Sequence, residues 1–329
     1  MKERIIRFSN KGIMLEGVIR YPDDISAPVP CLVLMHGSMD HDRDGNLLET
    51  ADGRPLFKNN FFLNISKRLC SEGYATLSWD KRGYGESSGI KGGYFSQASD
   101  AKAAIDKLIN ENSDLVDTKR IVGFGQSAGA YVQCLVAKDD SSLCAHILSG
   151  CLYRDYYDMM SFNYHRVRDY AQKSPENLEW AEKNDLWGLK LGLNLDRMFE
   201  AINSGKSEWI MEYKGVEEPM HVDLKEYSEE AAPKRQFRYI KKPTLVIHGR
   251  EDLNVPVQDA YDIDSELRAC GNRDVELVII PGVDHSFQHV AEDEETRLRE
   301  RMSLDSRKRT MSEEYLGHLC VFMKRVCSI

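Results

Sequence analysis

Uninterrupted runs of apolar residues recur along the chain and alternate with segments in which apolar residues return at helical spacing. Such runs suit strands that are buried on both faces of a parallel sheet. The expected strands are 3–8, 13–21, 30–35, 74–79, 121–124, 143–150, 244–248 and 274–280. The expected helices are 59–72, 97–110, 130–135, 256–269 and 311–327. Strands that alternate with helices in this way predict an α/β fold with a doubly wound, mostly parallel sheet.

The alternation stops between residues 151 and 239, where we find no buried-strand run. The chain enters this segment from the C-terminal end of the sixth strand, and open α/β sheets bind their ligands at that edge. We therefore expect a core formed by residues 1–150 and 240–329, with a helical cap at 151–239 inserted after the sixth strand.

The cap segment is rich in tyrosine, tryptophan and charge, and its apolar spacing predicts helices near 176–202 and 205–213. Its aromatic residues are expected either to line a substrate site or to pack the cap onto the core. Three of the four tryptophans of the chain lie here: Trp180, Trp187 and Trp209. A second charged stretch, 292–309, is expected to be a solvated helix or loop.

The composition is that of a soluble globular protein, with 42% hydrophobic and 29% charged residues. The net charge of −9 opposes a general affinity for nucleic acid or for anionic membranes. The first ten residues, MKERIIRFSN, lack the apolar centre of a signal peptide, and no run approaches the roughly 18 apolar residues of a membrane helix. We expect a cytoplasmic protein with no nucleic-acid or membrane partner.

The eight cysteines are scattered along the chain, and none of them forms a C-x-x-C pair. No spacing of cysteine and histidine matches a zinc site. We interpret the cysteines as small buried hydrophobic residues and expect neither a metal nor an organic cofactor.

A glycine-flanked serine lies between a predicted strand and a predicted helix. The segment Gly125-Gln126-Ser127-Ala128-Gly129 has the G-x-S-x-G pattern of a nucleophile elbow. In such an elbow a Cβ atom on either glycine would clash, and the serine hydroxyl points out above the sheet. The N-terminus of the next helix then lies beneath the reacting centre. A tight turn with a capping serine shares the pattern, but the strand–turn–helix context favours a nucleophile.

A serine hydroxyl needs a general base, and the base needs an acid that orients it. Two residues of the required types follow neighbouring strands: Asp252 comes after strand 244–248, and His285 comes after strand 274–280. The carboxyl ends of parallel strands meet at one edge of a sheet, so these side chains are expected near Ser127.

Other residues near these positions are weaker candidates. Glu251 adjoins Asp252, but the expected position of the acid before the Val-Pro segment matches Asp252. His289 lies four residues beyond His285 and is expected on a following helical turn. His36, at the end of strand 30–35, is expected to have a structural role.

Five segments resemble motifs of the α/β-hydrolase superfamily, within its serine esterase and S9-peptidase-like (dienelactone-hydrolase-like) branch. They are LVLMHGS, WDKRGYGESSG, GFGQSAG, LVIHGREDLNVP and PGVDHSF, in the expected order. The order Ser127, Asp252, His285 is also that of an α/β-hydrolase triad. The loop HGSMDHDRDGN is similar to the HGSGPxDRDGN loop of some bacterial esterases of this group. Met39 and Asp40 replace a glycine and a proline there, so we expect a differently shaped oxyanion loop.

The resemblance covers nearly all of the chain except the cap, and it implies a role for each matching residue. Ser127 attacks an acyl carbonyl, His285 transfers the proton to the leaving group, and Asp252 orients His285 and stabilises its charged form. Backbone N–H groups are expected to form the oxyanion hole, namely those of Ala128 and Ser38, with Met39 as the next candidate.

We predict a serine hydrolase that cleaves a small-molecule carboxylic ester through an acyl-enzyme intermediate. A peptidase or amidase, a thioesterase, an acyltransferase and a C–C bond hydrolase use the same residues and stay open as alternatives. A non-catalytic small-molecule binding protein is the alternative from another class, although such proteins usually lose a member of the triad. The sequence identifies neither the substrate nor the residues that bind it, and it leaves a homodimer through the cap or an edge strand open.

Overall fold

The computed structural model describes residues 1–47, 49, 56–139, 142–228 and 231–328. Its centre is an eight-stranded sheet with the order β1-β2-β4-β3-β5-β6-β9-β10. Antiparallel pairing joins β1 to β2 and β2 to β4, and all other neighbours are parallel. The strands are β1 (Lys2–Asn10), β2 (Ile13–Tyr21), β3 (Val29–Met35), β4 (Ala75–Trp79), β5 (Val116–Gln126), β6 (Leu143–Ser149), β9 (Thr244–Gly249) and β10 (Val275–Ile280). The predicted doubly wound, mostly parallel sheet is confirmed.

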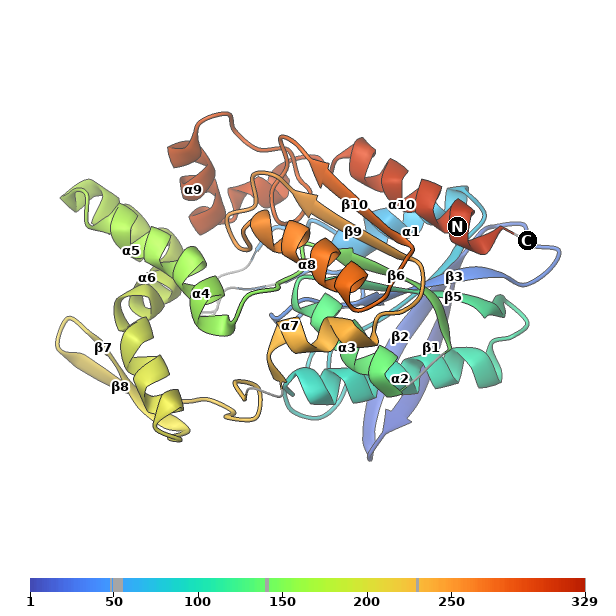
Figure 1. The fold of residues 1–329 in the computed structure, drawn as a ribbon, viewed down its shortest axis with the longest axis horizontal. Coiled ribbons are helices and arrows are strands. Elements are labelled where there is room, and N and C mark those ends of the chain that lie inside the picture. The colour runs from blue at the N-terminus through green and yellow to red at the C-terminus, as the bar shows by residue number, and fades with distance from the viewer. Residues whose placement is uncertain (48, 50–55, 140–141, 229–230, 329) are drawn as a thin grey trace.

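Helices cover both faces of this sheet (Figure 1). One face carries α1 (Phe61–Ser71) and α10 (Glu313–Cys327), and the other carries α2 (Tyr94–Glu111), α3 (Ala128–Asp139) and α8 (Gln258–Ala269). Alternate residues of β3 serve the two faces: Leu32 and Leu34 pack against α1 and α10, whereas Val33 and Met35 pack against α2 and α3. Two apolar faces explain why the central strands read as uninterrupted apolar runs.

Between β6 and β9 the chain leaves the sheet, and most of this segment folds beside the core, on the left of Figure 1. This segment contains α4 (Tyr156–Met160), the π-helix η1 (Ser161–His165), α5 (Arg166–Ala171), α6 (Pro175–Asn203), β7 (Glu208–Tyr213), β8 (Val216–His221), α7 (Pro233–Gln236) and the short 3₁₀ helix η3 (Phe237–Tyr239). α6 is kinked at Asp185, whose backbone angles, φ −148° and ψ 56°, are not helical.

The predicted helix at 205–213 is wrong, because residues 208–221 form the hairpin β7–β8. Trp209 and Met211 point inward while Ile210 is exposed, which is the two-residue period of a strand. Lys214 and Gly215 both have positive φ angles, 49° and 77°. Two successive residues of this kind are typical of a tight hairpin turn.

The charged stretch after β10 forms α9 (Glu294–Ser303) and the 3₁₀ turn η4 (Asp305–Lys308). Unlike the expected solvated helix, α9 buries one face, because Leu298 and Met302 pack with Val167, Tyr170 and Leu189 of α5 and α6. This contact joins α9 to the segment that follows β6. Within the described part of the chain, no helix combines the length and the apolar character needed to cross a membrane.

Candidate active site

The turn from β5 into α3 carries Ser127 in a left-handed conformation, with φ of 54°. A Cβ atom on Gly125 would lie 2.4 Å from backbone atoms of Ala130, and one on Gly129 would lie 2.2 Å from the carbonyl oxygen of Met35. Neither backbone neighbour can move aside as a flexible side chain could. The two glycines therefore allow the strand and helix to approach closely enough to hold the serine in its strained turn.

Asp252 and His285 meet beyond the ends of β9 and β10. Nδ1 of His285 lies 2.6 Å from Oδ2 of Asp252, and the carboxylate is fully buried. The other oxygen, Oδ1, accepts the backbone N–H groups of Asn254 and Val255 at 2.7 and 2.9 Å. Because the backbone donors hold Oδ1, the carboxylate keeps one orientation, in which Oδ2 faces His285.

The environment keeps Asp252 ionised. Burial favours the neutral acid, but the charge of His285 and hydrogen bonds from His248 and His285 outweigh it, so the pKa of Asp252 lies well below its usual range. The same pairing acts on the imidazole: burial opposes its protonation, yet Asp252 raises the pKa of His285 above its ordinary value. The aspartate is therefore suited to stabilise a positive charge on the ring.

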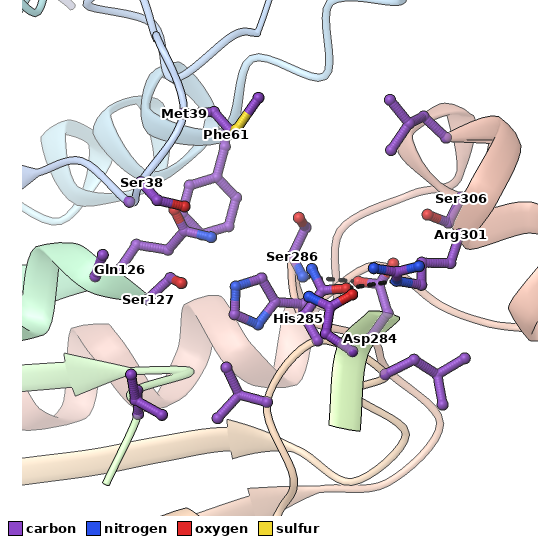
Figure 2. A pocket seen from close by; sticks show the side chains of 18 of the residues that line it. Ser38, Met39, Phe61, Gln126, Ser127, Asp284, His285, Ser286, Arg301 and Ser306 are labelled. Carbon is purple, nitrogen blue, oxygen red and sulfur yellow. Dashed lines mark hydrogen bonds between the residues drawn. The ribbon is translucent and has the colours of Figure 1, made fainter. Parts of the chain in front are cut away.

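Figure 2 shows the hydroxyl of Ser127 pointing toward the imidazole ring of His285. Both side chains line one cavity of about 350 Å³. Behind the ring lies Gly150, where an added Cβ would be 3.4 Å from Cε1 and Nδ1 of His285. Gly150 has a φ of 58°, a conformation that disfavours any larger residue here. Its role at the site was not identified from the sequence.

The weaker candidates lie elsewhere. Glu251 accepts the backbone N–H of Gly282 at 2.6 Å and does not contact the imidazole. The helical turn expected at His289 is absent, because that residue forms an isolated antiparallel bridge with Val283. Nε2 of His36 lies 2.7 Å from the carbonyl oxygen of Trp79, and burial lowers its pKa to about 3. A neutral, buried His36 is consistent with its expected structural role.

The loop after β3 borders the same cavity as Ser127. Ser38 and Met39 line the cavity together with Ala128, the first residue of α3. Beneath the loop, the buried ammonium group of Lys81 donates hydrogen bonds to three successive carbonyl oxygens, those of Gly37, Ser38 and Met39, at 2.9, 3.0 and 2.9 Å. Lys81 therefore holds the carbonyl groups of three successive loop residues in place.

Lys81 was not recognised from the sequence, although it directly follows a buried strand in the motif WDKRG. Only 6% of the residue is exposed, and burial lowers its pKa to about 7. The neighbouring charged residues brace the same region: Asp80 pairs with Arg43 at 2.6 Å, and Arg82 pairs with Asp100 at 2.5 Å.

The segment after β6 contributes mainly tyrosine and methionine side chains to the cavity wall, and none of its tryptophans lines the cavity. Trp209 is buried in a separate apolar cluster, and Trp180 lies under Arg299. The residues from this segment that line the cavity are Leu152, Tyr156, Met159, Met160, Asn163, Tyr164 and Tyr227. In the described chain, no three His, Cys, Asp or Glu side chains are grouped closely enough to hold a metal ion.

Solved structures with the same fold include an esterase of Pyrococcus furiosus, with 18% identity and a TM-score of 0.56 over 98% of this chain and 90% of that one. The α/β hydrolase GrgF of Penicillium sp. sh18 matches with 17% identity and a TM-score of 0.57 over 100% of both chains. An acylaminoacyl peptidase of Pyrococcus horikoshii matches with 16% identity and a TM-score of 0.57 over 99% of this chain and 42% of that one. At these identities the likeness concerns the fold.

No curated protein matches the sequence. A family model does match: that of the S15 family, described as X-Pro dipeptidyl-peptidase, over residues 11–286. This span includes the elbow serine, Asp252 and His285, and it runs through the segment between β6 and β9. The chain therefore belongs to the S15 peptidase family, within the esterase and peptidase branch of the α/β-hydrolase superfamily.

Proposed function

We propose that this protein is a serine hydrolase that cleaves a carboxylic ester through an acyl-enzyme intermediate. The observation that carries the proposal is the 2.6 Å hydrogen bond between Nδ1 of His285 and Oδ2 of Asp252, on an imidazole that faces the hydroxyl of Ser127 (Figure 2). A nucleophile, a base and an orienting acid in this arrangement can perform acyl transfer without a metal.

In the proposed reaction, Oγ of Ser127 bonds to the acyl carbon while Nε2 of His285 accepts the hydroxyl proton. The ionised Asp252 stabilises the resulting imidazolium. Backbone N–H groups of Ala128 and Ser38, or Met39 in place of Ser38, hold the negative oxygen of the tetrahedral intermediate.

The intermediate then expels the leaving alcohol, which takes the proton from His285. The acyl group stays on Ser127 until a water molecule attacks it. His285 accepts the proton of that water and returns it to Ser127 as the acid leaves, so the enzyme ends the cycle unchanged.

We also propose that residues 151–239 act as a cap that shapes the substrate cavity. Support comes from the seven side chains of this segment that line the cavity, three of them tyrosines. A wall of this kind suits a small acyl or alcohol group with apolar or aromatic parts.

A peptidase is the second candidate, because the matching family model is described as an X-Pro dipeptidyl-peptidase. Peptide and ester bonds are both cleaved by attack of a serine on an acyl carbonyl, so the same residues serve both reactions. The two candidates differ in leaving group and in the way the substrate is bound.

The test is labelling with a fluorophosphonate probe beside turnover of p-nitrophenyl esters of increasing chain length and of Xaa-Pro p-nitroanilides. Wild type should label and hydrolyse at least one ester, and Ser127→Ala should lose both. Ser286→Ala removes another hydroxyl that lines the cavity and serves as the control, so it should keep the label.

Turnover of the anilides with little ester hydrolysis would favour the peptidase. A wild type that neither labels nor turns over any substrate would overturn the proposal in favour of a binding protein.

A further inference from the structure

The helices α9 and η4 contribute several positively charged side chains to the cavity wall. Three arginines from α9 and η4 line the same cavity as Ser127 and His285, namely Arg297, Arg301 and Arg307. Figure 2 shows Arg301 beyond the imidazole, on the side away from Ser127. The proposed chemistry uses none of these positive charges.

Two of the arginines are occupied by contacts within the protein. Arg301 donates from Nε to Oδ1 of Asn254 at 2.8 Å, and its Nη1 lies 3.5 Å from a carboxylate oxygen of Asp185. Arg297 donates from Nη1 to two backbone carbonyl groups just ahead of its own helix. Arg301 therefore connects α9 to Asn254 and Asp185, and Arg297 connects α9 to the residues that precede it.

Arg307 differs from both. Among the described residues its guanidinium donates no hydrogen bond and has no carboxylate within ion-pairing distance, whereas Arg297 and Arg301 each donate at least one hydrogen bond. All three guanidinium groups have one buried nitrogen without an acceptor. Burial lowers its pKa, and the charge of Asp284 opposes that shift. A guanidinium stays charged at any physiological pH, so Arg307 is a partly desolvated cation that forms no ion pair with a described carboxylate. Such a charge is costly unless something pairs with it.

The acidic side chains of the cavity are committed elsewhere. Asp284 accepts two backbone N–H groups of its own turn at 2.8 and 3.0 Å, and burial raises its pKa. Glu251 accepts the backbone N–H of Gly282. Glu300 pairs with Arg309 through Oε1, and its buried Oε2 has no hydrogen-bond partner among the described residues. These three are the carboxyl groups that line the described cavity, and none of them neutralises Arg307 directly.

We propose that Arg307 binds a carboxylate group of the substrate, so that the enzyme prefers acyl compounds with a negative charge. This inference rests on the proposed function and adds a substrate class to it. One uncommitted guanidinium balances one negative charge, and its planar pair of N–H groups matches the two oxygens of a carboxylate.

The carboxylate has two possible sources, which two pairs of substrates distinguish. On the acyl side, mono-p-nitrophenyl glutarate is compared with p-nitrophenyl pentanoate, which has the same chain length and no charge. On the leaving-group side, p-carboxyphenyl butyrate is compared with its methyl ester. The variants are Arg307→Gln and Arg307→Lys. The control is Lys308→Gln, which removes one charge from an exposed neighbour outside the cavity.

Wild type should favour the charged member of one pair. Arg307→Gln should lower kcat/KM for that substrate about 10- to 100-fold, mainly through KM, and change the neutral ester less than about threefold. Arg307→Lys should keep part of the preference, and Lys308→Gln should keep all of it. The inference is overturned if wild type prefers the neutral member of both pairs, or if Arg307→Gln slows charged and neutral esters equally.

Calorimetric titration with glutarate keeps the two proposals separable, because it requires no turnover. Glutarate should bind wild type and bind Arg307→Gln at least about tenfold more weakly. Turnover of neutral esters without glutarate binding would refute the anion site alone. Glutarate binding without any turnover would refute the proposed hydrolase and leave the anion site supported.

Discussion

The three hydrogen bonds of Lys81 make a sharp prediction about the oxyanion loop. Its ammonium group joins the carbonyl oxygens of Gly37, Ser38 and Met39, and among these Ser38 and Met39 are expected to supply N–H groups to the reaction. The substitution Lys81→Met keeps a similar apolar stem and removes the donors. The loop then loses the anchor that holds its carbonyl groups in place.

The expected effect on folding is small because two large contributions oppose each other. The shift of the Lys81 pKa from 10.5 to about 7 corresponds to about 5 kcal/mol against the charged form. Three hydrogen bonds to a charged donor, at about 2 kcal/mol each, return roughly 6 kcal/mol. Lys81→Met should therefore lower the free energy of unfolding by only about 1–2 kcal/mol.

The expected effect on catalysis is larger. An oxyanion donor that leaves its position costs about 3 kcal/mol of transition-state stabilisation, or about 100-fold in kcat. The substrate contacts the loop mainly in the transition state, so KM should change little. Because the folded pKa of Lys81 is about 7, the ammonium loses its proton as the pH rises past 7. Wild-type activity should then decline on the alkaline side, and Lys81→Met should lack this limb.

The assay is hydrolysis of a p-nitrophenyl ester between about pH 6 and 10, with urea unfolding of the same samples. Lys102→Met is the matched control, because Lys102 lies on α2, pairs with Asp139 at 3.4 Å and does not act on Lys81. It should behave as wild type in both measurements. The reasoning is refuted if Lys81→Met keeps kcat within about threefold of wild type, or if its loss of activity matches an equally large loss of stability.

Two further predictions concern the base and the elbow. Since Asp252 raises the pKa of His285 above its ordinary value of 6.5 and only the neutral ring accepts the serine proton, kcat/KM should rise with pH through a midpoint above 6.5. Asp252→Asn should lower that midpoint and reduce kcat by about 10⁴-fold; an unchanged pH–rate profile would contradict this. Gly129→Ala places a Cβ 2.2 Å from the Met35 carbonyl oxygen and should destabilise the protein by about 3 kcal/mol or more. Gly317→Ala in α10, where nothing lies within 4 Å, should be neutral or stabilise by up to about 1 kcal/mol; equal urea midpoints for the two variants would refute the packing argument.

Patterns that depend on near neighbours in the chain were sufficient for most of the core. The run Val29–Met35 shows why: every second residue packs on α1 and α10 and the others pack on α2 and α3, so burial on both faces appears directly as apolar sequence. The elbow is equally local, since Gly125 and Gly129 flank Ser127 within five residues. These features were predicted correctly because the atoms that explain them come from adjacent residues or from any well-packed neighbour.

The segment after β6 shows the opposite case. Residues 205–213 have apolar positions that fit a helix as well as a strand, and the pairing with β8 decides between them. The burial of α9 depends on Val167, Tyr170 and Leu189 of α5 and α6, which are more than one hundred residues away in the chain from Leu298 and Met302. No local pattern carries that information.

The sequence by itself determined the α/β class, the order of the core elements, and the residue types and chain order of Ser127, Asp252 and His285. Only the tertiary structure decided which groups surround them: Gly150 behind the imidazole, Lys81 beneath the loop after β3, and Arg307 in the cavity wall. The physical reason is the separation along the chain of the residues that interact. Periodicity and turn chemistry reflect forces within a few residues, whereas a buried charge gains its role from the distant groups that do or do not pair with it.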